Sequence, residues 1–393
     1  MRNTTEYDAI ILGAGAAGLM CAAIAGQRGR NVLLLDHASE PGKKILISGG
    51  GRCNFTNLQT PAERYLSENP HFAKSALKRY GPEDFIALVD RHNIAWHEKT
   101  LGQLFCDGSA RQIVAMLLAE CELGGVELSL GEAVSDVGHG DGRYTIQFGN
   151  RNAAAPALVL ATGGLSILKM GATGFAYDLA RRFELDVIDP RPALVPLTLS
   201  GEDALFTSLS GVACEVIARC GDATFREAAL FTHKGLSGPA ILQVSSYWRD
   251  GRKVELDLLP DLDAGWLVAA KRSQPRTHLR AALSEHLPAR LATALSERIA
   301  LNNELANTPD RKLQDIENLL SKWQMTPSGS EGFAKAEVTA GGISTAGLSS
   351  QTMQAKNVPG LFAIGEAVDV TGWLGGYNFQ WAWSSGWAAA QAL

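Results

Sequence analysis

Short apolar runs that end in glycine recur at both ends of the chain. Tyr7–Leu12 is the first such run, Ala157–Gly164 is another, and Gly360–Asp369 lies near the C-terminus. Such runs are typical of parallel strands, because helices cover both faces of a parallel sheet. An alanine-rich helical stretch to about Arg28 and a second strand ending at Asp36 follow the first run. This pattern predicts a βαβ unit and an α/β fold of the Rossmann type.

The middle of the chain has a different pattern. Residues 195–259 alternate apolar and polar positions between turn signals, which predicts antiparallel strands. Residues 264–323 carry apolar positions three and four apart, which predicts helices. We therefore expect a nucleotide-binding domain from residues 1–193 and 336–393. The inserted part would be an antiparallel β domain over 194–263, completed by strands near 324–335, and a helical subdomain over 264–323.

Composition and charge narrow the class of protein. The chain has 393 residues, 46% of them hydrophobic, and a formal charge of −5, with no dense lysine and arginine run. These values predict a globular protein without a nucleic-acid partner. The six cysteines form no CxxC pair, which favours free thiols in a cytoplasmic protein. The apolar segment Ala9–Ala25 follows acidic residues and is interrupted by glycines, so we expect neither a signal peptide nor a membrane span.

The first glycine motif predicts a dinucleotide site. Gly13, Gly15 and Gly18 form GxGxxG between the first strand and its helix, and Asp36 ends the second strand. The glycines allow a tight turn and a close approach of the pyrophosphate, whose charge the helix N-terminus receives. The carboxylate is suited to bind the hydroxyl groups of an adenosine ribose. This motif alone does not distinguish NAD from FAD.

A second glycine-rich stretch, GKKILISGGGRCNFTN over 42–57, follows soon after the second strand. It offers backbone N–H groups without side chains at Gly49–Gly51, and polar groups at Arg52, Asn54 and Thr56. An isolated stretch of this kind is more often a surface loop. Its position beyond the carboxyl end of a parallel strand, where ligands bind in such folds, favours contact with a cofactor.

The C-terminal part provides a third glycine-rich stretch. Gly365 and Glu366 close a strand, and Gly375–Asn378 precedes a helix predicted to begin near Phe379. A helix N-terminus directed at a flavin would stabilise negative charge on the reduced ring. Together with the 42–57 stretch, this feature favours FAD over NAD.

Three residues are candidates for the chemistry. His233 is suited to proton transfer beside a flavin, although it can equally organise the turn over 235–239. Tyr377 can donate a hydrogen bond to a substrate or simply pack, and Arg52 can hold a substrate carboxylate or charge on the flavin. Cys53 is a further thiol whose part in the chemistry stays open. His97-Glu98 lacks the second histidine of HExxH, so no metal site is expected.

Eight segments occur in order and resemble one family: GAGAAGLM, GKKILISGGGRCNFTN, HEKTLGQLFC, LVLATGG, LVPLTL, LFTHKGLSGPAIL, AEVTAGGI and VTGWLGGYNFQWAWSSG. The chain closely resembles the YhiN/BaiN family of bacterial FAD-dependent flavoproteins, which includes aminoacetone-oxidase-like and bile-acid-precursor-reductase-like members. The likeness runs essentially end to end. It implies a two-part Rossmann-like FAD domain, an inserted β-barrel-like domain and a small helical subdomain.

The resemblance also implies a set of FAD-binding residues. Those toward the pyrophosphate and adenosine are Gly13, Gly15, Ala16, Ala17, Gly18, Asp36 and Val134, with Ala161, Thr162 and Gly163 at the end of the Ala157–Gly164 run. Those toward the flavin and ribityl are Lys44, Ser48, Gly49, Gly50, Gly51, Arg52, Cys53, Asn54, Thr56, Gly365, Glu366, Gly376, Tyr377 and Asn378.

These features predict an FAD-dependent oxidoreductase that moves a hydride between flavin and a small organic substrate. Amine oxidation and NAD(P)H-dependent reduction of an unsaturated compound both remain open, and a reductase would have to bind NAD(P)H transiently. The alternative is a flavin-binding regulatory protein without turnover. A flavin-linked nucleic-acid-modifying enzyme is disfavoured by the acidic balance. No membrane partner is expected, and the chain is expected to be a monomer or a homodimer.

Overall fold

The computed structural model describes residues 4–393, and the described chain forms two compact units. The first unit combines the part of the chain up to Arg191 with Val338–Leu393, and the second is Pro192–Glu337. The sequence predicted the corresponding division between residues 193 and 194 and between 335 and 336. The first unit is therefore assembled from two distant parts of the chain.

A five-stranded parallel sheet forms the centre of the first unit. Its order is β22 (Leu361–Ala363), β12 (Ala157–Leu160), β2 (Ala9–Leu12), β3 (Val32–Asp36) and β8 (Glu127–Leu130). The register places Leu12 between Leu35 and Leu160, so the ends of three strands lie side by side. This arrangement confirms the predicted Rossmann-type α/β fold.

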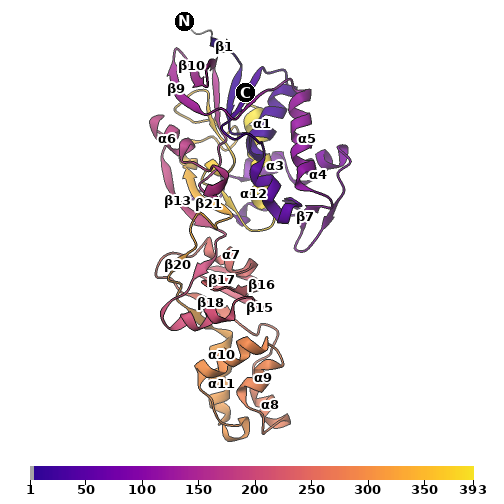
Figure 1. Cartoon of the computed structure of the whole chain (residues 1–393), viewed down its shortest axis with the longest axis vertical. Coiled ribbons are helices and arrows are strands. Elements are labelled where there is room, and N and C mark those ends of the chain that lie inside the picture. The colour runs from indigo at the N-terminus through magenta and orange to yellow at the C-terminus, as the bar shows by residue number, and fades with distance from the viewer. Residues whose placement is uncertain (1–3) are drawn as a thin grey trace. The chain divides into compact units, whose positions relative to one another are not determined.

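Helices and a second sheet enclose the parallel sheet. The helices α1 (Ala16–Gln27), α5 (Ala110–Leu123) and α12 (Tyr377–Ala390) pack against one another beside it (Figure 1). A four-stranded sheet contacts β2 and β12 through its inner strands. Its order is β1 (Thr4–Glu6), β11 (Arg151–Ala155), β10 (Arg143–Phe148) and β9 (Val134–Gly140). The strands β2 and β12 are thus fully buried, as their continuous apolar runs predicted.

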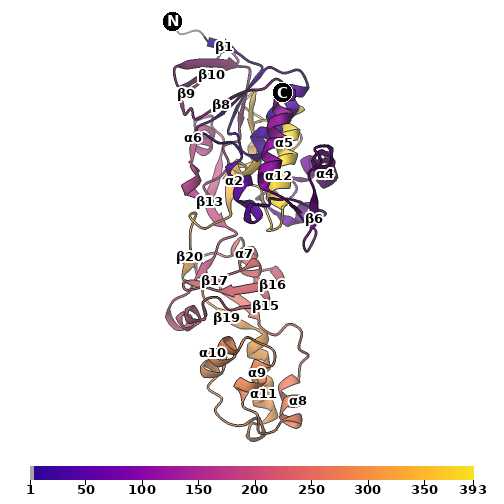
Figure 2. The ribbon, with the colours of Figure 1, turned by 45° about the vertical axis from the view of Figure 1, so that its right-hand side comes forward.

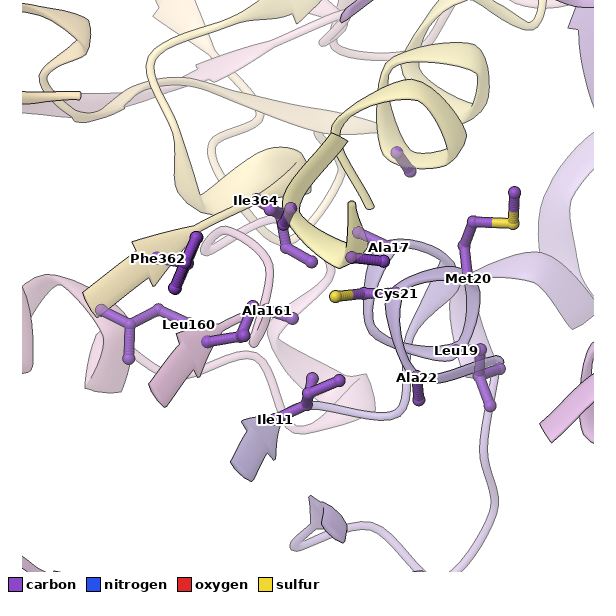
Figure 3. Packing of buried hydrophobic residues seen from close by; sticks show 14 of the residues in the cluster. Ile11, Ala17, Leu19, Met20, Cys21, Ala22, Leu160, Ala161, Phe362 and Ile364 are labelled. Carbon is purple, nitrogen blue, oxygen red and sulfur yellow. The ribbon is translucent and has the colours of Figure 1, made fainter. Parts of the chain in front are cut away.

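The core of this unit lies where α1 meets the strands. Figure 3 shows Cys21 of α1 pointing toward Ala161, which follows β12, and Ile364, which follows β22, while Leu19 and Met20 lie on the other side of the helix. Helix α12 packs on α1 at Gly386, where an added Cβ would lie 2.6 Å from the carbonyl oxygen of Ala17. The small residues of both helices therefore allow their backbones to approach closely.

Shorter elements surround this core. The helices are α2 (Lys43–Ile47), α3 (Lys74–Arg79), α4 (Pro82–Arg91) and α6 (Phe175–Arg182). Three small sheets pair β4 (Asn54–Asn57) with β7 (Gln103–Cys106) and β6 (Trp96–Glu98), β5 (Tyr65–Leu66) with β23 (Thr371–Gly372), and β13 (Val187–Ala193) with β21 (Val338–Ile343).

The second unit contains a seven-stranded antiparallel sheet. Its order is β19 (Trp323–Met325), β18 (Val254–Asp257), β15 (Ala213–Cys220), β16 (Ala223–Phe231), β17 (Gly235–Ser237), β14 (Leu197–Thr198) and β20 (Gly329–Ser330). Helix α7 (Pro239–Ser245) packs against β15 and β16. The alternation of apolar and polar residues predicted antiparallel strands here, and the antiparallel pairing of β15 with β16 and β18, and of β16 with β17, confirms them.

Four helices form a separate group within the second unit. They are α8 (Trp266–Ser273), α9 (Leu279–Ser284), α10 (Ala289–Ile299) and α11 (Asp310–Ser321), shown in orange in Figure 2. Their buried side chains are mainly leucines three and four residues apart, as the periodicity predicted. No helix among residues 4–393 has the length and apolar character needed to cross a membrane.

Candidate functional site

The loop after β2 has the geometry of a dinucleotide cradle. Gly13 has a φ of 110°, and a Cβ on Gly18 would lie 1.8 Å from the Gly13 carbonyl oxygen. Larger residues at these two positions would force the loop away from the helix. A Cβ on Gly15 would meet nothing within 4 Å, so this glycine faces open space. Gly15 also caps α1 without a side chain, which leaves the positive end of the helix unneutralised by acidic groups of its first turn.

Asp36 stands beside this loop at the carboxyl end of β3. Its carboxylate accepts hydrogen bonds from the backbone N–H groups of Ala14 (2.7 Å) and Ala38 (2.8 Å). A carboxylate offers about four acceptor positions, so two further hydrogen bonds, such as those from ribose hydroxyls, can be accepted. The loop that leads to Val134 is attached here, because Glu132 N–H donates to the Asp36 carbonyl (3.2 Å).

The segment that follows β12 packs against the glycine loop after β2. A Cβ on Gly13 would lie 2.4 Å from the Ala161 carbonyl oxygen, so the two loops are in close contact. The Oγ1 atom of Thr162 is buried and has no hydrogen-bond partner among the described residues. A buried hydroxyl without a partner is costly, and a polar group of a bound cofactor would satisfy it. Gly163 continues this loop with a φ of 76°.

A buried ion pair links α2 to the segment after β22. The Lys44 ammonium donates to Glu366 (2.7 Å) and to the Ser166 hydroxyl (2.6 Å). Glu366 also accepts from Ser166 (2.8 Å) and from the N–H of Thr339 (2.9 Å). Burial raises the pKa of Glu366, but the charge and hydrogen bond of Lys44 outweigh it and lower the pKa below its usual value. The carboxylate is therefore ionised at neutral pH and fixes the lysine.

The GGG segment forms an exposed, left-handed loop. Gly49, Gly50 and Gly51 have φ values of 56°, 68° and 86°, and a Cβ on either of the last two would meet nothing within 4 Å. Ser48 is held by its hydroxyl, which donates to the Ile45 carbonyl (2.7 Å), while the Arg52 side chain is exposed. The backbone of this loop is thus open to a ligand, as the run of glycines predicted.

Cys53 differs from the reactive thiol that the sequence left open. It is fully buried, and burial raises the pKa of its thiol far above the usual value. A thiol that remains protonated is a poor nucleophile and a poor redox group. Because the Arg52 side chain is exposed, it does not accompany the thiol into the interior. The structure therefore contradicts a low-pKa Cys53.

Two distant glycine-rich segments meet in this unit. A Cβ on Gly376 would lie 2.3 Å from the Thr56 carbonyl oxygen, so β4 touches the N-terminus of α12. The Thr56 hydroxyl donates to Gln380 (2.6 Å), and the Asn57 amide donates to the Gly375 carbonyl (3.1 Å). When the side-chain amide of Asn54 is rotated so that both its nitrogen and its oxygen find hydrogen-bond partners, its oxygen accepts from the Gly376 N–H at 3.3 Å. The stretches 42–57 and 373–380 are thus in direct contact, through residues that are largely buried.

Tyr377 and Asn378 begin α12 and are held by neighbouring groups. Tyr377 is buried, and its hydroxyl accepts a hydrogen bond from Arg64, whose guanidinium lies 5.5 Å from the centre of the Tyr377 ring. The Asn378 amide bonds to both the N–H (2.8 Å) and the carbonyl (2.9 Å) of Gly372. These side chains therefore shape the helix N-terminus, while Gly365 is held separately by the Ser385 hydroxyl (3.0 Å).

His233 lies in the second unit, on the loop between β16 and β17. Its imidazole is exposed. The turn that follows is organised by Thr232, whose hydroxyl accepts from the N–H groups of Lys234 (3.3 Å) and Gly235 (3.1 Å). Organising this turn is therefore the work of Thr232 and not of His233.

Sequence reasoning missed several residues of the site. Arg64, Ser166, Thr339 and Gln380 hold predicted residues in place but were not singled out, although Thr339 and Gln380 lie within segments that carry the family resemblance. Ser166, two positions after the glycines that end the Ala157–Gly164 run, carried a positional signal. The others come close to the site through chain folding, which the spacing of residues does not reveal.

Comparison with known proteins extends this picture. The family model described as the HI0933-like protein Rossmann domain matches residues 7–392. The chain belongs to this family. It is 50% identical to the ribosomal RNA dihydrouridine synthase of Escherichia coli K12, over 99% of this chain and 98% of that protein. It is 29% identical to the 3-dehydro-bile acid delta(4,6)-reductase of Clostridium scindens, over 97% of this chain and 98% of that protein.

The family consists of flavin-dependent oxidoreductases, and the resemblance found in the sequence is confirmed. Among solved structures, the 3-ketosteroid-delta4-(5alpha)-dehydrogenase of Rhodococcus jostii RHA1 matches with a TM-score of 0.51 at 14% identity. The match covers 99% of this chain and 100% of that one. At this identity the likeness shows the fold alone.

The Lys44–Glu366 pair gives a stability prediction. Their side chains are 31% and 19% exposed, so a single substitution leaves a half-buried charge without its partner. We expect Glu366→Gln to lower the free energy of unfolding by about 1–3 kcal/mol at pH 7. The pKa of Glu366 is lower in the folded chain than in the unfolded chain, where it is about 4.3. The ionised carboxylate therefore stabilises the fold fully above about pH 4.3, and this stabilisation is lost as the pH falls through the pKa of the folded chain. The difference between variant and wild type should therefore shrink below about pH 4.

A double-mutant cycle in urea with Lys44→Met measures this coupling. The exposed pair of Asp178 and Arg181 on α6 is the matched control, and Asp178→Asn should change stability by less than about 1 kcal/mol. A loss for Glu366→Gln that is unchanged between pH 7 and pH 3 would contradict the assignment of the effect to the ionised carboxylate.

Proposed function

We propose that this protein is an FAD-dependent reductase that converts a uridine of ribosomal RNA to dihydrouridine. The observation that carries the proposal is the 50% identity, over essentially the full length of both chains, to a ribosomal RNA dihydrouridine synthase. This proposal departs from the expectation that nucleic acid is not a partner. That expectation rested on net charge, which describes the whole chain and not a local surface.

The first unit fits FAD. Gly13–Gly18 would receive the pyrophosphate at the N-terminus of α1, and Asp36 would accept from the adenosine ribose. The Val134 loop would lie toward the adenine. The open backbone of Gly49–Gly51 and the N-terminus of α12 would lie along the flavin, with Arg52 and Lys44 as nearby positive charges. The flavin supplies hydride chemistry when it is bound, and NAD(P)H is the proposed transient reductant.

The two relatives named above suggest a shared type of reaction. Uridine has a C5–C6 double bond conjugated to the C4 carbonyl, and the bile-acid relative is named for double bonds in a 3-dehydro substrate. Reduction of such a bond adds a hydride to the carbon distant from the carbonyl and a proton to the carbon next to it. The reductive branch of the predicted chemistry therefore fits better than amine oxidation.

The relative from Clostridium scindens favours a second candidate function, the reduction of a small unsaturated ketone. This second function would require no contact with RNA. A flavin-binding protein without turnover would instead leave both kinds of substrate unchanged. The three functions are distinguished by which substrate reoxidises the reduced flavin.

The cofactor proposal predicts the behaviour of a variant at Gly15. Because a Cβ there would meet nothing within 4 Å, Gly15→Trp should leave the apoprotein folded while its side chain fills the pyrophosphate position. We expect the flavin content of the purified protein, measured by absorbance at 450 nm, to fall on the order of tenfold or more. The melting temperature of the apoprotein should remain close to wild type. Normal flavin content in this variant would contradict the assigned cradle.

Expression of this chain in an Escherichia coli strain without its own ribosomal RNA dihydrouridine synthase tests the proposed activity. We expect dihydrouridine to reappear in ribosomal RNA, measured by mass spectrometry of nucleosides. The Gly15→Trp variant is the control and should restore little. If the flavin-loaded wild-type chain restores no dihydrouridine while its reduced flavin is reoxidised by an unsaturated ketone, the second candidate function takes its place.

We also propose His233 as the proton donor, because its imidazole is exposed and histidine is a common proton-transfer group in enzymes. His233→Asn should slow reoxidation of the reduced flavin by substrate about 10²- to 10⁴-fold. Reduction by NAD(P)H, followed by stopped-flow absorbance, should be unchanged. Tyr377→Phe is the comparison: since Arg64 holds the buried phenol, we expect it mainly to lower stability. Equal reoxidation rates in His233→Asn and wild type would reject this role.

A further inference from the structure

The helical group of the second unit has a charge opposite to that of the chain. Residues 264–323 contain nine lysines and arginines and six acidic residues, a formal charge of +3, while the whole chain carries −5. The remainder of the chain therefore carries −8. Within 264–284 there are four basic residues and no acidic one. Positive charge is thus concentrated on a part of the chain that the overall composition conceals.

Three arginines of this segment are exposed. Arg272 lies in the last turn of α8, Arg276 in the turn between the helices and Arg280 in the first turn of α9. No ion pair involving them is found among residues 4–393. We call these three residues the α8–α9 basic patch. Unpaired guanidinium groups that are close in sequence offer planar donors suited to phosphate oxygens.

The backbone between the helices is held in place. The N–H of Ala306 donates to the Pro275 carbonyl (2.9 Å), and the N–H of Leu305 donates to the Thr277 carbonyl (2.8 Å). The N–H of Thr277 also donates to the Gln274 carbonyl (3.0 Å), which closes the turn that carries Arg276. The turn that carries the patch is therefore held in place by backbone hydrogen bonds.

The first turn of α11 brings two further basic residues beside the patch, although the helix as a whole carries three acidic residues against these two. Lys271 donates to Asp310 (2.7 Å) and to the Thr308 carbonyl (2.8 Å), so the end of α8 lies next to the start of α11. Arg311 and Lys312 follow Asp310 and are exposed. The acidic groups near the patch are partly engaged, because Lys271 pairs with Asp310 and the Gln274 amide donates to Glu285 (3.4 Å).

The surroundings favour RNA over a membrane. The exposed residues between Arg272 and Arg280 are polar, apart from Pro275, and the large exposed hydrophobic side chain of the described helical group, Leu319, lies near the end of α11, away from its first turn. Membrane-surface binding requires apolar side chains beside the basic ones. Nucleic-acid binding requires only the positive charges that contact phosphates.

We propose that the α8–α9 basic patch, formed by the exposed Arg272, Arg276 and Arg280, binds the phosphate backbone of ribosomal RNA. The proposal rests on the proposed function for the identity of the RNA, and on the charge and exposure of the three arginines for the surface. Phosphate contacts position a nucleic acid without reading its sequence. The patch would therefore supply affinity and orientation, and the choice of uridine would be made elsewhere.

The test uses the flavin-loaded, oxidised protein and an unmodified transcript of ribosomal RNA, with affinity measured by filter binding at several salt concentrations. In the triple variant Arg272→Gln, Arg276→Gln and Arg280→Gln we expect binding on the order of 100-fold weaker at 0.1 M salt. The slope of log affinity against log salt should fall by about 2–3. Flavin content and reduction by NAD(P)H should be unchanged.

Two control variants accompany this experiment. Lys74→Gln, Lys78→Gln and Arg111→Gln remove the same charge from exposed sites of the first unit and should leave the salt slope unchanged. Replacing the three patch arginines by lysine keeps the charge and should preserve most of the slope. A loss of equal size in the first-unit control would overturn the proposal, since net charge would then suffice.

The outcomes separate this proposal from the proposed function. Binding is measured without turnover, so arginine-dependent RNA binding supports the patch even if no dihydrouridine is formed. Dihydrouridine formation with wild-type RNA affinity in the triple variant overturns the patch and leaves the proposed function intact. Patch-dependent binding to phosphatidylglycerol vesicles, without patch-dependent RNA binding, also overturns it in favour of a membrane.

Discussion

The contact of Gly376 with the Thr56 backbone is the constraint on which the candidate site depends. It brings the N-terminus of α12 against β4, although the two are separated by most of the chain. The hydrogen bond from the Trp383 indole to the Phe55 carbonyl (2.8 Å) fixes the same contact from the next turn of the helix. Because no side chain fits between these backbones, the contact between β4 and the N-terminus of α12 can form only with glycine at residue 376.

An ion pair is the second interaction that fixes the geometry of the candidate site. The Lys44–Glu366 pair joins the α2 segment to the end of β22, and Ser166 bonds to both partners. A pair of this kind is costly to bury, but its full set of hydrogen bonds offsets the loss of hydration. The positive charge of Lys44 is then held at a fixed place near the glycine loop. The proposed flavin site thus has an ion pair held in fixed geometry at its border before any ligand binds.

Two interpretations from the sequence failed or were changed for physical reasons. The possibility of a reactive Cys53 was contradicted because neighbouring residues say nothing of burial, and burial raises the pKa of the thiol. The acidic net charge indicated no nucleic-acid partner, yet α8 and α9 carry a local concentration of arginines. Averages over a chain conceal both burial and the local sign of charge.

The sequence by itself determined the Rossmann-type fold, the helix over the C-terminal tryptophans and the family, because apolar period and glycine spacing are local properties that survive in the unfolded chain. Only the tertiary structure decided that Arg64 holds Tyr377, that Gln380 meets Thr56, and that Cys53 is buried. These contacts join residues far apart along the chain. They depend on which surfaces the core brings together, and no period or spacing in the sequence records that.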